Sequence, residues 1–466
     1  MEYRIERDSM GEMQVPADRY WAAQTQRSYQ NFKIGIEKMP TEIVHAFGIL
    51  KKGAAIANFN LGKLDEERKN VICQAADDVI SGKLMDHFPL AVWQTGSGTQ
   101  SNMNSNEVIA NRGNEIAGKK ILHPNDHINM SQSSNDTFPT ALHIAAAMSI
   151  EDNLFPAMDK LTETLKRLES ENEDVVKSGR THLQDAVPIR LGQEFKAYSV
   201  AILRDLNRMD KAMDEMRTLN MGGTAVGTGL NADESYLRRI VPNLSEISGM
   251  DLVQAYDLID ATQNLDSFVA VSGAVKACAV TLSKIANDLR LMSSGPRAGF
   301  GEINLPAKQN GSSIMPGKVN PVIPEVVNQV AFNAIGNDMT ITMAAEAGQL
   351  ELNAFEPIIF YCLFQSIDTI AYAVNTFVDN CVIGITANET RCRYFVENSV
   401  GIITAICPYV GYQKAAEIAK EAIKTGESVR KLIIETGLLT KEQMDEIMDP
   451  VQMTEPGISG KTVNKI

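Results

Sequence analysis

The sequence predicts an all-α protein built around a central bundle of five long helices. Apolar residues recur at spacings of three and four over residues 140–177, 189–219 and 255–292, the pattern of helices that bury one face. Two more helical segments are predicted at 322–349 and 357–384. Helices near forty residues exceed the usual globular length and are difficult to bury in a small domain. We therefore expect the bundle to associate with copies of the same chain.

The length of 466 residues is too great for one ordinary hydrophobic core, and we predict three domains. Residues 1–138 mix short helical patterns with polar loops. Residues 139–392 carry the long helices, and residues 393–466 carry shorter helices followed by proline and glycine.

Composition excludes several functions. The chain is 44% hydrophobic, and we find no apolar run long enough to span a bilayer, so no membrane partner is expected. The charged start Met1–Asp8 has no apolar segment of signal type and predicts a cytoplasmic protein. A net charge of −14 without a basic block argues against nucleic-acid binding. An anionic ligand would need local positive charge in its site.

The cysteines and histidines predict no metal site. The six cysteines form no CxxC pair, and the six histidines form no HExxH pair. Neither a Walker loop nor a GxGxxG motif is present. We therefore expect buried, reduced thiols and no metal or organic cofactor.

The run Gly311–Pro321, GSSIMPGKVNP, is the strongest functional signal. It gathers the hydroxyls of Ser312 and Ser313, the ammonium of Lys318 and the amide of Asn320 in one loop. Glycine lets successive backbone N–H groups point at an anion. A helix-initiating turn is the alternative, but the composition of the whole run favours a site that holds a carboxylate.

Two polar stretches precede the predicted bundle. In the first, residues 95–104, Ser97 and Thr99 alternate with glycines, a pattern that also fits a flexible turn. In the second, residues 123–136, the triplet Ser133, Ser134 and Asn135 offers two hydroxyls and an amide. The same triplet could cap the helix that follows, and the two roles are compatible because helix N-termini attract anions.

A third stretch, residues 179–186, follows the first long helix and pairs Thr181 with His182. Histidine is the usual general acid or base near neutral pH, although a single histidine often has a structural role. Glu325, a few residues beyond Asn320, could orient such a histidine.

The run Gly-Ser-Ser-x-Met-Pro-x-Lys-x-Asn resembles the signature of the fumarase/aspartase superfamily. Ser97-Gly98-Thr99, Ser133-Ser134-Asn135 and Thr181-His182 resemble its other active-site regions in the same order. The resemblance covers nearly the whole chain. It implies a homotetramer with a core of twenty helices, active sites built by three subunits, a small dicarboxylate substrate and no cofactor.

The resemblance also implies roles for individual residues. Ser312 would remove the proton next to one carboxylate, and Lys318 and Asn320 would receive the charge of the aci-carboxylate that forms. His182, oriented by Glu325, would act on the leaving-group side. The implied substrate-binding residues are Ser97, Thr99, Ser133, Ser134, Asn135, Thr181, Ser313, Lys318 and Asn320. A second dicarboxylate site is implied at His123, Asn125 and Asp126.

The leaving group divides the superfamily, and the sequence resembles both branches. The first third, with Trp93–Gln100 and the Ser-Ser-Asn triplet, is similar to class II fumarate hydratases. Asp260–Asn264, Pro321–Val326, Glu346–Gln349 and Thr425–Arg430 are similar to aspartate ammonia-lyases. We give more weight to the first third, because the family places those loops against the substrate.

We therefore expect reversible hydration of fumarate to (S)-malate, with deamination of aspartate as the alternative. A non-catalytic structural homologue is a further alternative, which the intact serine loop and Thr-His pair disfavour.

Overall fold

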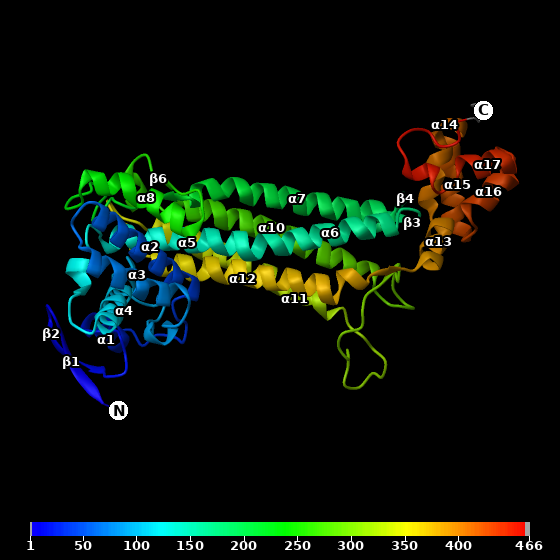
Figure 1. The fold of residues 1–466 in the computed structure, drawn as a ribbon. Helices are drawn as coiled ribbons and strands as arrows, with labels where there is room; N and C mark the ends of the chain where they lie inside the picture. The colour runs from blue at the N-terminus through cyan, green and yellow to red at the C-terminus, as the bar shows by residue number, and fades with distance from the viewer. Residues whose placement is uncertain (1, 462–466) are drawn as a thin grey trace. The chain divides into compact units, whose positions relative to one another are not determined.

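The computed structural model describes residues 2–461 and is helical along most of the chain (Figure 1). The predicted all-α class is confirmed, with four small two-stranded sheets added among the described residues. The chain divides into two compact units. Unit 1 comprises residues 1–156, 205–280 and 330–371, and unit 2 comprises residues 157–204, 281–329 and 372 onward. The three-domain division stays a prediction.

The α-helices are α1 (Ala23–Asn31), α2 (Thr41–Asn60), α3 (Glu66–Ile80), α4 (Thr99–Ala117), α5 (Ser134–Ser149), α6 (Phe155–Glu171), α7 (Leu191–Met216), α8 (Glu234–Ser248), α9 (Leu258–Gln263), α10 (Asp266–Met292), α11 (Val322–Glu346), α12 (Glu356–Asn380), α13 (Glu389–Asn398), α14 (Cys407–Val410), α15 (Tyr412–Thr425), α16 (Val429–Thr436) and α17 (Lys441–Ile447). The paired strands are β1 (Tyr3–Asp8) with β2 (Gly11–Pro16), β3 (Val176–Thr181) with β4 (Gln184–Arg190), β5 (Thr218–Leu219) with β6 (Val253–Gln254), and β7 (Ile303–Asn304) with β8 (Thr386–Ala387).

The long helical segments are present, with two corrections to their predicted bounds. A π-helical turn, Ile150–Leu154, joins α5 to α6, so the first segment is helical over 134–171 rather than 140–177. The residues that follow enter strand β3 instead of extending the helix. The alternating hydrogen bonds of a hairpin therefore replace the helical period there.

The predicted single helix over 255–292 is wrong, because the structure breaks it into α9 and α10. The Asp257 side chain caps α9 by accepting from the N–H groups of Ile259 and Asp260. Asn264 then adopts an extended backbone and donates from Nδ2 to Asp260 Oδ1 at 2.7 Å. Local capping by Asp and Asn overrides the apolar periodicity at this point.

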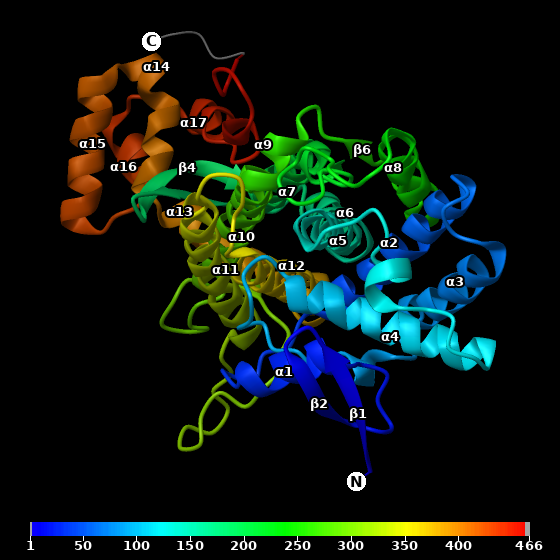
Figure 2. The same cartoon turned by 90° about the vertical axis from the view of Figure 1, so that its left-hand side faces the viewer.

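Unit 1 is organised around α2, which packs against α3, α5 and α8 (Figure 2). Aromatic rings fill its centre. Phe138 of α5 meets Phe360 of α12 edge to face, with ring centroids 5.9 Å apart, and Phe268 of α10 meets the same ring at 4.9 Å. Edge-to-face aromatic pairs add specific geometry to apolar burial. The start of α5, which carries the Ser-Ser-Asn triplet, therefore rests on a rigid core.

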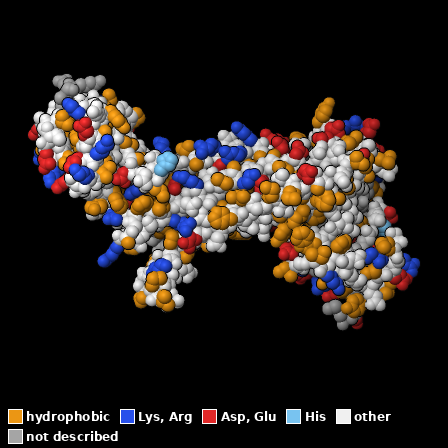
Figure 3. All heavy atoms as spheres, turned by 180° about the vertical axis from the view of Figure 1, so that it is seen from behind, with side chains coloured by type: hydrophobic (Ala, Val, Ile, Leu, Met, Phe, Trp, Pro, Cys, Tyr) orange, Lys and Arg blue, Asp and Glu red, His pale blue; other side chains and the backbone are white. Residues whose placement is uncertain are grey.

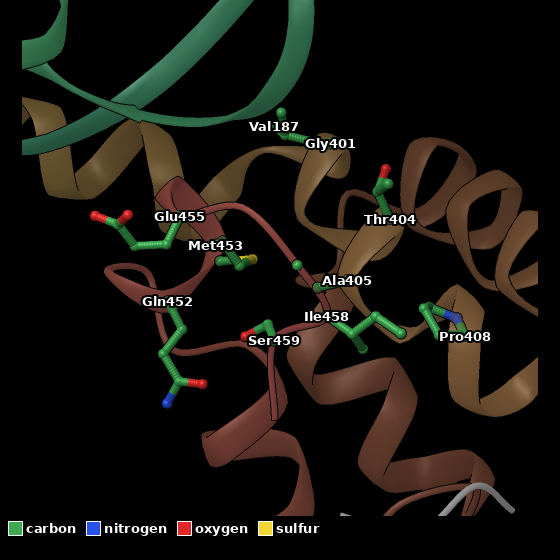
Figure 4. Close-up of a pocket in the computed structure, with 11 residues that line it drawn as sticks. Val187, Gly401, Thr404, Ala405, Pro408, Gln452, Met453, Glu455, Ile458 and Ser459 are labelled. Carbon is green, nitrogen blue, oxygen red and sulfur yellow. The ribbon is translucent and has the colours of Figure 1, made fainter. Parts of the chain in front are cut away.

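Unit 2 contains the β3–β4 hairpin and the compact group α13–α17, which has its own hydrophobic core. The hairpin is braced by the residues after α17. Arg190 of β4 pairs with Glu455, and Gln193 of the adjoining α7 donates from Nε2 to Thr454 O at 3.1 Å. A cavity of about 280 Å³ lies between β4 and this segment (Figure 4), lined by Val187, Gly401, Thr404, Ala405, Pro408, Gln452, Met453, Glu455, Gly457, Ile458 and Ser459.

Two segments, Asp266–Met292 and Glu356–Gly384, are long and apolar enough by composition to cross a membrane. The expectation that no run reaches this length is therefore wrong. Their most apolar windows are 50% and 67% buried within the chain, as expected for helices that share a bundle core.

The six cysteines are free thiols. Cys278, Cys362, Cys381 and Cys392 are buried, as expected, whereas Cys73 and Cys407 are partly exposed. Burial raises the pKa of the four buried thiols, which keeps them in the unreactive protonated form.

Candidate active site

Hydroxyl groups from two helix starts form a row in unit 1. Thr99, the first residue of α4, places Oγ1 3.1 Å from Ser134 Oγ at the start of α5. Ser97 Oγ lies 3.4 Å from Thr99 Oγ1. Gly98 precedes α4 with φ +69°, and a Cβ there would lie 2.0 Å from the Phe138 ring. Only glycine lets the loop approach the aromatic core this closely.

The Ser-Ser-Asn triplet caps α5, which confirms the capping interpretation of its sequence, and its role in substrate binding stays a prediction. Ser133 and Asp136 form a capping box. Asp136 is fully buried and also accepts from the N–H groups of Gly222 and Thr224 at 3.2 and 3.1 Å. Burial raises the pKa of its carboxyl to about 6. Asn135 donates from Nδ2 to Ala225 O at 2.8 Å, which leaves its Oδ1 beside Ser134 Oγ at 3.4 Å.

His182 and Thr181 lie at the tip of the β3–β4 hairpin in unit 2. Thr181 pairs with Gln184 across a two-residue loop, and His182 and Leu183 have φ of +55° and +59°. Positive φ at both central residues defines the tight turn preferred by hairpins, and non-glycine residues rarely adopt it. His182 is exposed and makes no side-chain hydrogen bond within residues 2–461. The structure thus presents its imidazole on a strained, projecting turn.

A buried ion pair braces this hairpin. Arg180 donates from Nη1 to Glu302 Oε1 at 2.8 Å, and Glu302 is fully buried. The Arg180 guanidinium also lies 4.1 Å from the ring centroid of Phe300. Lys177 Nζ is 3.6 Å from Glu302 Oε2. The pair therefore fixes the strand directly before Thr181 against the segment that leads to the serine loop.

The serine loop lies between α10 and α11 and is irregular (Figure 1). Ser312 Oγ accepts from the backbone N–H groups of Ile314 and Met315 at 3.2 and 3.0 Å. Two such donors stabilise negative charge on the oxygen and favour its deprotonation. Gly311 N–H donates to Lys318 O at 2.8 Å and closes the base of the loop.

The other predicted residues of this region have different surroundings. Lys318 is exposed, and its ammonium has no partner within the described part of the chain. Asn320 donates from Nδ2 to Gly311 O at 2.9 Å, so its amide helps to hold the loop. Ser313 is exposed. Glu325 lies 3.7 Å from Arg290 Nη2, and its proposed pairing with His182 stays a prediction.

The predicted second dicarboxylate site forms a π-helical turn, Pro124–Ile128. His123 Nδ1 lies 3.3 Å from Asp126 Oδ2, and Asn125 is exposed beside them. Its use as a site stays a prediction. No group of three or more His, Cys, Asp or Glu side chains that could hold a metal occurs among the residues described.

Comparison with known proteins identifies the family. The family model described as "Lyase" matches residues 11–336, and the one described as "Fumarase C C-terminus" matches residues 402–455. The chain belongs to the lyase family. The resemblance to the fumarase/aspartase superfamily is therefore confirmed.

Relatives of this lyase carry both activities in their names. An aspartate ammonia-lyase of Bacillus subtilis is 52% identical over 99% of this chain and 98% of its own length. A class II fumarate hydratase of Bacillus cereus is 51% identical over 98% of this chain and 100% of its own length. A class II fumarase structure from Schistosoma mansoni has a TM-score of 0.95 at 36% identity, covering 98% of this chain and 100% of that one.

Proposed function

We propose that this lyase catalyses the reversible hydration of fumarate to (S)-malate. The observation that supports it best is the contact between Thr99 Oγ1 and Ser134 Oγ. It joins the Gly-Ser-Gly-Thr-Gln and Ser-Ser-Asn segments, the two that resemble hydratases, into one polar surface. Hydroxyls in this arrangement can donate to a substrate carboxylate and to the hydroxyl that leaves or enters.

In the direction of malate dehydration, Ser312 acts as the base. Its Oγ takes the proton from the carbon beside one carboxylate, and the electron pair moves onto that carboxylate to form the aci-carboxylate. Backbone N–H groups of the loop, together with Lys318 and Asn320, stabilise this charge. His182 stands on the leaving-group side, where a proton delivered to the departing hydroxide releases it as water.

The complete site is part of the same proposal and requires several copies of the chain. The α11 helix carries exposed apolar side chains along one face, at Phe332, Ile335, Met339 and Met343, and Figure 3 shows hydrophobic side chains on the surface of the long helices. Exposed apolar stripes of this kind mark association surfaces. We therefore propose a homotetramer in which different subunits supply Thr99, His182 and Ser312.

Deamination of aspartate is the second candidate. It is favoured by the 52% identity to the Bacillus subtilis aspartate ammonia-lyase and by the aspartase-like segments of the bundle and small domain. A cytoplasmic location belongs to the proposal. So does a role in the tricarboxylic acid cycle, since fumarate and malate are intermediates of that cycle.

The deciding experiment follows the ultraviolet absorbance of fumarate when purified enzyme receives malate or aspartate in separate reactions. We expect fumarate to accumulate from malate. Rapid turnover of aspartate with none of malate would reject hydration in favour of deamination. Failure on both substrates would reject both candidates.

A further inference from the structure

A lysine ammonium lies completely inside unit 1. Lys51 of α2 has no exposed surface. Its Nζ donates to three amide oxygens, Asn102 Oδ1 at 2.6 Å, Asn129 Oδ1 at 3.3 Å and Gln132 Oε1 at 2.8 Å. It pairs with no carboxylate in the part of the chain that the structure describes. Burial of a charge is costly unless the charge is both paired and hydrogen-bonded, so an ammonium held by amides alone needs a reason.

The three amides belong to the segments that carry the hydroxyl row. Asn102 lies one helical turn after Thr99, and its N–H donates to Gly98 O at 3.0 Å. Gln132 directly precedes the Ser-Ser-Asn triplet. Lys51 therefore links the segment that carries Thr99 to the segment that carries Ser134. It does so through amide side chains that are not part of the hydroxyl row.

We propose that Lys51 is a positioning residue for substrate binding, which fixes the amides of Asn102, Asn129 and Gln132 and thereby holds Thr99 and Ser134 in register. The inference rests on the proposed function, since it assigns substrate binding to that hydroxyl row.

The chemistry of the ammonium explains how it selects one arrangement. An ammonium offers three donors and no acceptor, so each amide must turn its oxygen toward it. The amide nitrogens then point away from the ammonium and bond other groups. Asn102 Nδ2 donates to Asn129 Oδ1 at 3.0 Å, and Gln132 Nε2 donates to the carbonyls of Ile128 and Met130, both at 3.0 Å. The fold of residues 128–132 therefore depends on the orientation that Lys51 imposes.

Loss of the proton would disturb this network. A neutral amine has two donors and a lone pair, so one amide oxygen would face an acceptor. Burial lowers the pKa of Lys51 to about 7, against the attraction of Asp136. The carboxylate of Asp136 is the charge that faces it. The other titratable groups packed around α2 have partners other than Lys51. Tyr236 faces Asp136, and Glu107 accepts hydrogen bonds from the start of α1. His127 lies beside His123, and Asp77 pairs with Lys52.

The first test compares Lys51→Met with the matched control Lys52→Met, which changes the adjacent lysine of the same helix. KM and kcat are measured on whichever substrate the wild-type enzyme turns over, together with the Kd of fumarate by calorimetry. Loss of about one oriented hydrogen bond to the substrate predicts a KM and Kd roughly tenfold higher for Lys51→Met. We expect kcat to change little and the control to match wild type. A folded Lys51→Met enzyme with wild-type KM and Kd overturns the inference.

The second test does not require Lys51→Met to fold. In the wild-type enzyme, KM should rise as pH passes through about 7. Asn102→Asp puts a carboxylate against the ammonium, favours its charged form and should move this rise to higher pH. A purely structural lysine would change stability without moving the curve, so identical KM–pH curves overturn the inference. A protein that binds fumarate with the predicted Lys51 dependence but converts neither substrate contradicts only the proposed reaction.

Discussion

The two regions that carry the proposed chemistry differ in how the chain holds them. The hydroxyls of Thr99 and Ser134 start two helices, and their segments are joined through Lys51. His182 and Lys318, in contrast, are exposed and make no side-chain bond within the described residues. One chain thus holds the hydroxyl row in place by itself, and leaves His182 and Lys318 projecting. This difference is expected if the reacting groups meet their substrate on another copy.

The largest effect is expected from Ser312→Ala. Loss of the base should lower kcat by about 10³-fold or more, since positioned proton transfer contributes on the order of 10²–10⁴, while the binding region is untouched. Steady-state kinetics and the mass of the assembly check this. An active Ser312→Ala enzyme would show that another group removes the proton. The wild-type activity measured beside this variant tests the non-catalytic alternative, because a structural homologue would have no activity to lose.

His182→Asn should lower kcat by about 10²-fold, because the leaving group then departs without a positioned acid. The Kd of fumarate should stay near the wild-type value, since the hydroxyl row is intact. Steady-state kinetics measures the change in kcat, and calorimetry measures the Kd of fumarate separately. An equally large rise in Kd would place His182 among the binding groups instead.

Glu302→Gln tests the brace behind the hairpin. It leaves Arg180 buried without its counter-charge, and breaking one partner of a buried pair is strongly destabilising. We expect kcat to fall by about tenfold as the turn loses its fixed position, together with a lower Tm. Glu194→Gln, which alters the neighbouring carboxylate of Lys177, is the matched control. Equal effects of both variants would contradict a specific role for the Arg180–Glu302 pair.

Thr99→Val removes one hydroxyl of the row and keeps the shape of the side chain. We expect KM to rise by about tenfold with kcat nearly unchanged. This rise corresponds to the loss of one hydrogen bond to a charged group. Thr137→Val, one turn into α5, removes a hydroxyl that bonds the Ser133 carbonyl and serves as control. A wild-type KM for Thr99→Val would remove Thr99 from the binding surface.

The smallest effect on activity is expected from Glu356→Gln. Glu356 begins α12 fully buried, with both carboxyl oxygens unpartnered in the described structure, and burial raises its pKa well above the usual 4.5. The unfolded carboxyl ionises above about pH 4.5 while the folded one stays protonated. The free energy of unfolding therefore falls as pH rises, by about 1.4 kcal/mol per pH unit, until the folded pKa is reached.

Glutamine cannot ionise, so Glu356→Gln should raise Tm more at pH 8 than at pH 5, with unchanged kinetics. Thermal melts at the two pH values measure this. A Tm difference that is the same at both would mean that Glu356 is ionised in the folded protein.

The sequence predicted the helical class because apolar periodicity over long segments reports burial directly. Polar composition also singled out the segments that carry the hydroxyl row and the serine loop, and their assignment as the site stays a prediction. The sequence missed the His182 hairpin, because the positive φ at His182 and Leu183 that closes the turn leaves no periodic signal in the sequence. Lys51 was also missed, since an isolated lysine in a helical pattern reads as a surface residue until its burial is known.

Complementation between two inactive variants tests the central claim most directly. Ser312→Ala and His182→Asn are each purified alone and as hybrids produced by co-expression. If different copies supply the two groups, about a quarter of the sites in a random hybrid retain both native residues. We predict that co-expression restores about that fraction of wild-type activity. Hybrids as inactive as either parent would show that one chain supplies both groups, and would contradict a site assembled between copies.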